Sequence, residues 1–316
     1  RRLIKQYRPI ACMSFGRGPN LVNLICRRRG TKVLPSIRGY ATVERIIQKK
    51  WMRALYTRAD QIICVSRGIE DKLQKEIPAL AGKTSVLYNA YNCGQIASEA
   101  KREIPDSLQS AGQPRLVSIG TLRPEKGYWH LIKAVSLLKR DYPNIHLSLV
   151  GPDYLENGAN LKSLAERLGL RDNVHFEGWH SNPYSFTEHS DIYVLSSVRE
   201  GFPNALVEAM ACGKPVVAAD CLTGPREILS ELPWDTVASE IEQAEYGILV
   251  PRLDIREDYT ENIFPEEETL AEAIRLLLEN PALREEYGKR AAKRAEEFSY
   301  QACTERVIRI LEGKPG

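Results

Sequence analysis

Two glutamates eight positions apart are the first residues whose types and spacing could do chemistry. Glu200 precedes a Gly-Phe-Pro turn in the stretch REGFPNALVEAMACGKPVV, residues 199–217, and Glu208 stands in the apolar helical segment that follows. An acid in a loop and an acid inside the next helix are poorly placed to act on one atom. An ionised carboxylate does accept two hydrogen bonds, which suits a vicinal diol such as ribose. We therefore expect one acid to hold a ribose and the other to contact a second polyol.

Two cations three residues apart form a second constellation. Arg123 and Lys126 lie in TLRPEKG, directly after the expected strand 115–120. Ligands of open α/β sheets bind beyond the carboxyl ends of the strands, where such a cation pair can hold a diphosphate. A solvated loop is the alternative for these cations, and a first-turn acid that complements the helix dipole is the alternative for Glu208. Two charged groups at two strand ends of one sheet favour the functional interpretation.

Backbone groups complete this expected site. The helix after Pro203 begins with the amides of Asn204, Ala205 and Leu206, which lack intrahelical acceptors and can face an anion or sugar hydroxyls. A nucleotide sugar contains every part that these groups would bind: a ribose, a diphosphate and a second polyol.

The elements that must position these residues alternate between strand and helix. Near-continuous apolar strands separated by helices predict a parallel sheet covered on both faces, a Rossmann-like domain. The expected strands are 115–120, 146–151, 173–178, 191–197, 215–220 and 247–250, and the expected helices are 128–140, 160–170, 204–213 and 269–280.

The first part of the chain resembles the later portion of a second Rossmann-like domain. We expect strands at 9–15, 32–38 and 61–66, helices at 20–30 and 45–59, and a linker at 91–114. The predicted division is an N-terminal domain with its linker at 1–112, a nucleotide-sugar-binding domain at 113–295, and a final amphipathic helix at 296–316 that packs against the first domain.

Composition narrows the class of protein. A chain of 316 residues with 43% hydrophobic and 27% charged residues fits a globular protein of two domains. No run of eighteen apolar residues predicts a membrane-spanning helix. The seven cysteines form no CxxC pair and no metal-ligand spacing with the five histidines, so we expect reduced thiols in a cytoplasmic protein and no zinc site.

Charge is divided unevenly along the chain. Residues 1–112 contain 21 Lys and Arg against 8 Asp and Glu, a charge of +13, and the remainder carries −10. This asymmetry indicates an anionic partner, either a membrane surface or a phosphorylated molecule, with chance clustering on a solvated surface as the alternative. Nucleic acid is disfavoured because the basic part lacks interleaved aromatics and any helix-turn-helix or finger pattern.

A family resemblance follows from these motifs. The stretch EGFPNALVEAMACGKPVVAADCLTGPREIL at 200–229, with GTLRPEKG, GILVPRLD and RAEEFSYQ, resembles the GT-B glycosyltransferases of the retaining family 4, group 1. The resemblance covers about residues 55–312. It implies two Rossmann-like domains facing a cleft, the N-terminal one incomplete and lacking its opening strands, with the C-terminal helix packing back on the first domain.

The resemblance also implies roles for individual residues. Glu200 would contact the donor sugar near the reacting carbon, Glu208 would bind the ribose, and Arg123 and Lys126 would neutralise the diphosphate leaving group. Further donor contacts would come from Gly120, Phe202, Pro203, Asn204, Ala205 and Leu206, and the base would lie near Gly178, Trp179 and His180. Trp179 has a packing role as its alternative.

Two arginines complete the expected set. Arg226 would face the cleft from a helix start, with an ordinary surface arginine as the alternative. Arg38, in SIRG, takes the place of the family's usual histidine and would bind an acceptor or donor phosphate, since a permanently charged side chain is a poor base.

The expected activity is retaining transfer of a hexosyl or N-acetylhexosaminyl group from a nucleoside-diphosphate sugar, with UDP-sugar the expected donor, to a cell-envelope glycan or lipid-linked acceptor. We expect this activity to serve polysaccharide or lipopolysaccharide biosynthesis and to need no metal or other cofactor. We expect the protein to be cytoplasmic, with a peripheral position on the inner membrane face. The missing G-x-G-x-x-G argues against a nicotinamide dehydrogenase, and the missing D-x-D against metal-dependent GT-A transferases. A sugar-nucleotide epimerase or hydrolase of the same fold and a non-catalytic nucleotide- or lipid-binding subunit remain open.

Overall fold

The chain folds into two compact units. The computed structural model describes residues 2–154 and 156–313. Contacts group the residues up to Ala90 with those from Tyr300 onward as unit 1, and Tyr91–Ser299 as unit 2. The sequence-based division differs from these units at residues 91–112, because α6 (Cys93–Ala100) and α7 (Asp106–Gln109) form there and α6 packs against helices of unit 2.

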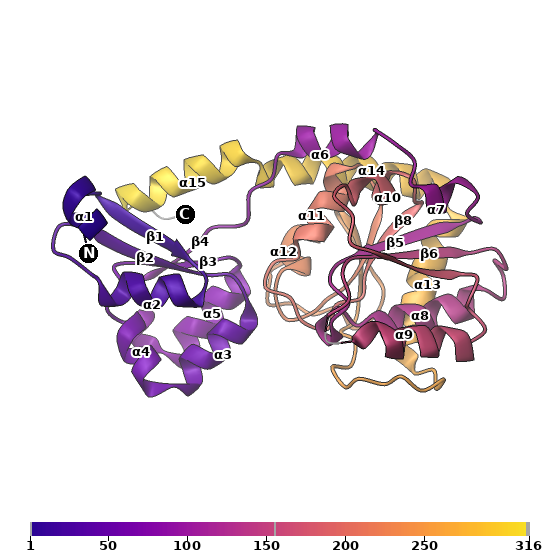
Figure 1. The fold of residues 1–316 in the computed structure, drawn as a ribbon, viewed down its shortest axis with the longest axis horizontal. Helices are drawn as coiled ribbons and strands as arrows, with labels where there is room; N and C mark the ends of the chain where they lie inside the picture. Colours follow the sequence, from indigo (N-terminus) through magenta and orange to yellow (C-terminus); the bar gives the residue numbers. More distant parts are fainter. Residues whose placement is uncertain (1, 155, 314–316) are drawn as a thin grey trace. The chain divides into compact units, whose positions relative to one another are not determined.

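Unit 1 contains a parallel sheet in the order β1-β2-β3-β4 (Figure 1). Its strands are Ala11–Phe15, Lys32–Ile37, Ile62–Cys64 and Thr84–Val86, and its helices are α1 (Arg2–Tyr7), α2 (Arg17–Ile25), α3 (Tyr40–Gln48), α4 (Lys50–Tyr56), α5 (Arg67–Glu76) and α15 (Tyr300–Glu312), with a short 3-10 helix at Pro78–Leu80. The three predicted strands are confirmed. The fourth strand was missed because it has only three residues, two of them Thr and Ser, without an apolar run.

Two further features of unit 1 bear on the sequence predictions. The single helix expected at 45–59 is wrong, because the extended backbone of Lys49 separates α3 from α4. The predicted docking of the last helix on the first domain is confirmed: Ile310 of α15 joins a buried cluster with Leu34, Ile63 and Leu87.

Unit 2 contains a seven-stranded sheet in the order β10-β11-β9-β8-β5-β6-β7. The strands are β5 (Arg115–Ile119), β6 (His146–Val150), β7 (Val174–Gly178), β8 (Ile192–Leu195), β9 (Val216–Ala219), β10 (Glu242–Ala244) and β11 (Gly247–Val250). All pairings are parallel except β10 with β11, so the predicted parallel sheet is confirmed and β10 is an addition. The strand order reverses between β5 and β8, the point where open α/β sheets bind ligands.

Helices cover both faces of this sheet (Figure 1). Helices α8 (Tyr128–Leu138) and α9 (Asn157–Arg167) pack together on one side with α13 (Pro265–Glu279), and α10 (Tyr184–Glu188), α11 (Asn204–Ala211) and α14 (Pro281–Ala295) lie on the other. The remaining elements are α12 (Pro225–Leu229) and 3-10 helices at Pro124–Lys126 and Glu296–Phe298.

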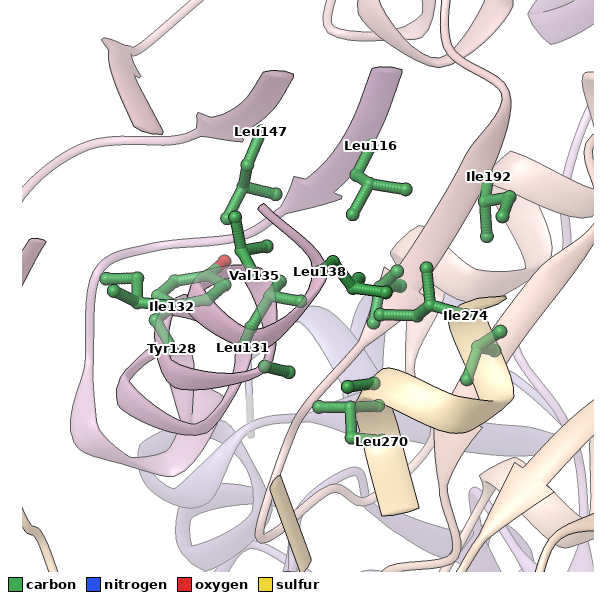
Figure 2. Close-up of a cluster of buried hydrophobic side chains, with 14 of the residues drawn as sticks. Leu116, Tyr128, Leu131, Ile132, Val135, Leu138, Leu147, Ile192, Leu270 and Ile274 are labelled. Carbon is green, nitrogen blue, oxygen red and sulfur yellow. The ribbon is translucent and has the colours of Figure 1, made fainter. Parts of the chain in front are cut away.

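The core of unit 2 fixes the strand ends that carry the candidate site. Figure 2 shows Leu131 and Val135 of α8 within the cluster that includes Leu116 of β5 and Ile192 of β8. Burying a Leu or Ile side chain contributes roughly 1.5–3 kcal/mol each. The two central strands are therefore held in a fixed register, and the loops that leave them start from fixed points.

Candidate functional site

A direct ion pair joins the two charged constellations. Lys126 ends the 3-10 helix that follows β5, and Glu200 lies in the loop that follows β8. The ammonium Nζ of Lys126 donates to Oε1 of Glu200 at 2.7 Å, with 23% of the lysine and 12% of the glutamate side chain exposed. Ser197, directly after β8, donates its hydroxyl to the same oxygen at 2.8 Å. Both predicted charges thus lie at the point where the strand order reverses.

Backbone contacts hold the two loops together. The amide of Val198 donates to the carbonyl of Glu125 at 2.9 Å, and the hydroxyl of Ser196 donates to the carbonyl of Lys126 at 3.0 Å. Gly127 adopts a left-handed conformation with φ of 59°, and a Cβ there would lie 2.2 Å from the Ser196 carbonyl oxygen. Only glycine permits this approach, so the position of Lys126 depends on it.

Gly120 gives room to the same lysine. A Cβ at Gly120 would lie 3.0 Å from both Cε of Lys126 and the hydroxyl oxygen of Tyr128. That hydroxyl donates to the Gly120 carbonyl at 3.1 Å. The visible role of Gly120 is to let the Lys126 side chain cross the end of β5, and its donor contact stays a prediction.

Arg123 has a different neighbour from Lys126. Its side chain is exposed, and its guanidinium carbon lies 4.0 Å from the centre of the Tyr154 ring. Such a stack stabilises an exposed arginine by about 0.5–1 kcal/mol. The two cations lie in one loop, but only Lys126 pairs with Glu200.

Glu208 is a partly buried carboxylate on α11. Burial raises the pKa of Glu208 above its ordinary value. Among the residues that the structure describes, none donates a hydrogen bond to this carboxylate or forms an ion pair with it. The first turn of α11 contains no acid, so the alternative of a first-turn dipole acid is wrong for Glu208. Both of its oxygens therefore have unused acceptor positions.

The start of α11 corrects one predicted contact. The amide of Leu206 already donates to the Pro203 carbonyl at 3.2 Å, because the first turn closes in the i to i+3 manner, so this amide is not open to a ligand. The amide of Ala205 has no acceptor among the described residues. The side chain of Asn204 accepts a hydrogen bond from the Tyr91 hydroxyl at 2.7 Å.

The turn before α11 is held by packing. Phe202 is buried and lies edge-on against Phe298, with 5.4 Å between ring centres. Pro203 is buried against Gly224, where a Cβ would lie 2.6 Å from the proline Cδ. Thr223 donates its hydroxyl to the carbonyl of Glu200. These side chains fix the turn, and the donor contacts predicted for Phe202 and Pro203 stay predictions.

The loop expected to hold the base begins at Gly178, which ends β7 with φ of 73°. Trp179 is 71% exposed, so the packing alternative for it is wrong. His180 is exposed, its Nε2 lies 3.1 Å from the Glu177 carbonyl oxygen, and its ring lies against Phe186. The loop therefore presents one large aromatic surface to solvent.

Arg226 lies in the interior of unit 2. Its side chain is 3% exposed, and its guanidinium pairs with Asp220 at 2.7 Å and with Glu242 at 2.8 Å. The surface-arginine alternative is wrong. The predicted open arginine facing the donor is not observed either. Arg226 is paired with Asp220, which follows β9, and with Glu242 of β10, a strand that the sequence did not predict.

Arg38 lies just beyond β2 in unit 1. Its guanidinium donates to the Ser36 hydroxyl at 2.8 Å and to Oδ1 of Asn89 at 2.6 Å, and lies 5.0 Å from the centre of the Phe15 ring. The side chain is half-buried and held in place at a strand end. Its predicted role in binding phosphate stays a prediction.

A group with metal-ligand spacing lies elsewhere in unit 2. Ligand atoms of His130, Glu266 and Glu267 lie within 4.8 Å of one another. Nδ1 of His130 contacts Oε1 of Glu267 at 2.6 Å, and the amide of Phe264 donates to the other oxygen of Glu267 at 2.6 Å. These bonds close the start of α13 and give Nδ1 of His130 and both oxygens of Glu267 protein partners.

Unit 2 contains two cavities, one of which is lined in part by His180 of the loop expected to hold the base. One, of about 560 Å³, is lined by His130, Asp258 and Phe264 among others, and one, of about 700 Å³, by Arg102, Asp106 and His180 among others. Neither has Glu200 or Glu208 in its lining. Within residues 2–154 and 156–313, no helix has the length and apolar character needed to cross a membrane.

The fold defines the class of protein first. The chain has the fold of the GT-B glycosyltransferases: HepE of Anabaena, solved in complex with UDP, matches it with a TM-score of 0.78, at 20% identity, over 98% of this chain and 81% of HepE. At this identity the likeness concerns the fold.

The family follows from the sequence of the site-bearing region. Residues 100–234 match the model of the family "Glycosyl transferases group 1", so this part of the chain is similar to that family. An uncharacterized glycosyltransferase of Methanocaldococcus jannaschii is 30% identical over 267 residues, covering 82% of this chain and 64% of that protein.

A further relative comes from Campylobacter jejuni. It is the N-acetylgalactosamine-N,N'-diacetylbacillosaminyl-diphospho-undecaprenol 4-alpha-N-acetylgalactosaminyltransferase, 26% identical over 304 residues, which cover 93% of this chain and 74% of that enzyme. The chain thus spans between 64% and 74% of the length of these two relatives. The resemblance that the motifs predicted is confirmed, and the enzyme class of the relatives is glycosyltransferase.

Proposed function

We propose that the protein transfers a hexosyl or N-acetylhexosaminyl group from a nucleoside-diphosphate sugar, with UDP-sugar as donor, to a cell-envelope glycan or lipid-linked acceptor, with retention of anomeric configuration. One observation carries the proposal: Lys126 and Glu200 are paired where the strand order reverses, in the same unit as Glu208, an acid with no partner among the described residues. This set provides a cation for a diphosphate and two carboxylates for polyols.

The chemistry follows from charge. When the bond between the sugar carbon and the diphosphate oxygen breaks, negative charge develops on the leaving phosphate. The Lys126 ammonium and the Arg123 guanidinium would neutralise that charge, an effect worth about 3–4 kcal/mol for one well-placed donor. Because fixed side chains supply the positive charge, the proposal needs no metal. Glu200 would accept hydrogen bonds from the donor sugar, Glu208 from the ribose, and Trp179 would lie against the base.

Two of the compared proteins support the donor and acceptor classes. HepE, which shares the fold, was solved with UDP. The Campylobacter relative is named for an acceptor linked to undecaprenol through a diphosphate. These two compounds, UDP and a diphospho-undecaprenol-linked saccharide, guide the choice of substrates for the assay.

The basic first part of the chain suggests where the acceptor is met. A charge of +13 over residues 1–112 is suited to an anionic leaflet or to a lipid diphosphate, and it supports the proposal of a peripheral position on the cytoplasmic face of the membrane. Cosedimentation with vesicles containing anionic lipid should fall as salt rises, because salt screens surface charge. Sedimentation independent of both salt and anionic lipid would contradict this localisation.

The deciding experiment adds donor and acceptor together. A thermal-shift screen of nucleotide sugars finds the donor, since a ligand of the folded state raises the melting temperature. The selected donor is then incubated with a diphospho-lipid-linked saccharide, with and without EDTA. Transfer that survives EDTA supports the proposal. Free nucleotide without transfer would indicate the epimerase or hydrolase, and binding alone would indicate a non-catalytic subunit. Glu200→Ala is the matched inactive control.

A further inference from the structure

We propose that Ser197 is the positioning residue for Glu200: its hydroxyl holds one carboxylate oxygen of Glu200 and leaves the other open to the donor sugar. The inference rests on the proposed function, because that function assigns the sugar contact to Glu200. No motif in the sequence pointed to Ser197.

The contact is specific to one oxygen. The Ser197 hydroxyl and the Lys126 ammonium both donate to Oε1 of Glu200, at 2.8 and 2.7 Å. Oε2 of Glu200 receives no hydrogen bond from the residues that the structure describes. Two donors on one oxygen restrict the orientation of the carboxylate, and since the group has about four acceptor positions, the second oxygen keeps its own for the sugar.

Binding of the nucleotide-sugar donor should affect Lys126 and Ser197 differently. A diphosphate at Lys126 competes with Glu200 for the ammonium, since both are anions. Ser197 is neutral and 0% exposed, so an incoming anion has no access to it. Its hydroxyl is therefore the donor that keeps Oε1 in place after the diphosphate has bound, when the orientation of Glu200 matters for transfer.

Backbone contacts hold both Ser197 and Glu200 in place, so the Ser197 hydroxyl has a fixed position relative to the Glu200 side chain. Ser197 follows β8, which is paired with β5 on one side and β9 on the other. The carbonyl of Glu200 is held separately by the Thr223 hydroxyl. With its backbone held by Thr223, the remaining freedom of Glu200 lies in its side chain, and Ser197 restricts that freedom.

The test compares Ser197→Ala, Ser197→Thr and a matched control, Ser190→Ala. Ser190 is also buried, and its hydroxyl donates to the Phe186 carbonyl at 2.7 Å, away from Glu200. We expect Ser197→Ala to lower kcat for sugar transfer about 10- to 100-fold, the range for losing a hydrogen bond to a charged group. KM for the donor and the Kd for UDP should change less than about twofold. Ser197→Thr, which keeps the hydroxyl, should recover most of kcat, and Ser190→Ala should leave kcat unchanged.

Several outcomes would overturn the inference. They are an unchanged kcat in Ser197→Ala, a UDP Kd that rises as much as kcat falls, and a kcat of Ser197→Thr as low as that of Ser197→Ala. Crystal structures of the wild type and Ser197→Ala give a readout that does not depend on turnover. A displaced or multiply oriented Glu200 carboxylate in the variant supports the positioning role, and an unmoved carboxylate contradicts it. A wild type that turns over no nucleotide sugar would instead count against the proposed function.

Discussion

Lys126 and Glu200 are 74 positions apart in the chain, and their charged atoms lie 2.7 Å apart. Each stands at the carboxyl end of a strand, and these strands, β5 and β8, are neighbours in the sheet. The pair is mostly buried, which strengthens its attraction relative to a pair in water. A cation suited to phosphate and an acid suited to sugar hydroxyls thus share one hydrogen bond at the place where an open sheet binds ligands.

The two glutamates should have separable roles. Glu208→Ala should weaken UDP binding about 30- to 100-fold, because a ribose diol loses two hydrogen bonds to a charged acceptor. Glu200→Ala should bind UDP nearly as the wild type does and lower kcat about a thousandfold, as expected for a group that acts at the reacting sugar. Calorimetric titration with UDP and a transfer assay measure these effects. Equal losses of UDP affinity in both variants would show that the division of roles is wrong.

The raised pKa of Glu208 predicts a pH dependence of UDP binding. Burial favours the protonated form of Glu208, whereas ribose hydroxyls donate to the ionised form. Affinity should therefore fall as pH decreases through that raised pKa, and UDP binding near this pH should release a proton. Glu208→Gln should lose this component, so titrations of the two proteins over the same pH range separate it from titration of UDP itself.

The same pKa has a consequence for stability. An acid with a raised folded-state pKa stabilises the fold at low pH, and this contribution is lost as pH rises through the folded value. Without ligand, the wild type should therefore lose stability relative to Glu208→Gln as pH increases from about 5 to about 8. A difference in melting temperature that does not change with pH would contradict the burial of an ionised Glu208.

Gly127 should be far less tolerant of alanine than Gly169. Both have positive φ, of 59° and 69°, so both substitutions cost about 1–2 kcal/mol of backbone strain. A Cβ at Gly169 meets nothing within 4 Å, but one at Gly127 would lie 2.2 Å from the Ser196 carbonyl oxygen. Gly127→Ala should thus cost roughly 3 kcal/mol or more in urea unfolding. Similar losses for the two variants would mean that the two loops are not in close contact.

Trp179 should contribute to nucleotide affinity but little to stability. Because its side chain is 71% exposed, Trp179→Ala should change the melting temperature by less than about 2 °C. Loss of an aromatic surface for the base should weaken UDP binding about tenfold and leave pyrophosphate binding unchanged. Competition titrations with the two ligands measure this difference. Equal weakening of both ligands would show that Trp179 does not contact the base.

The periodicity of apolar residues predicted helices and strands correctly where these elements were long and apolar. The strands 115–120 and 146–151 and the helix 128–140 were expected from one chain segment each and are present as β5, β6 and α8. It failed where an element was short or polar, as in β4 and β10, since three residues give no period to detect. The break between α3 and α4 was missed because one extended residue, Lys49, leaves the helical pattern almost unchanged.

By itself, the sequence determined which charged residues stand at the carboxyl ends of parallel strands, because alternation of apolar strands and helices is a local property. The sequence also determined the family resemblance, because the motifs that carry it are contiguous stretches of residues. Only the tertiary structure decided which of those residues meet. The pairing of Lys126 with Glu200 depends on β5 and β8 being neighbours, and the ion pair of Arg226 with Glu242 depends on β10, a strand with no local signal. Contacts between distant segments follow from sheet order and burial, which no single stretch of residues encodes.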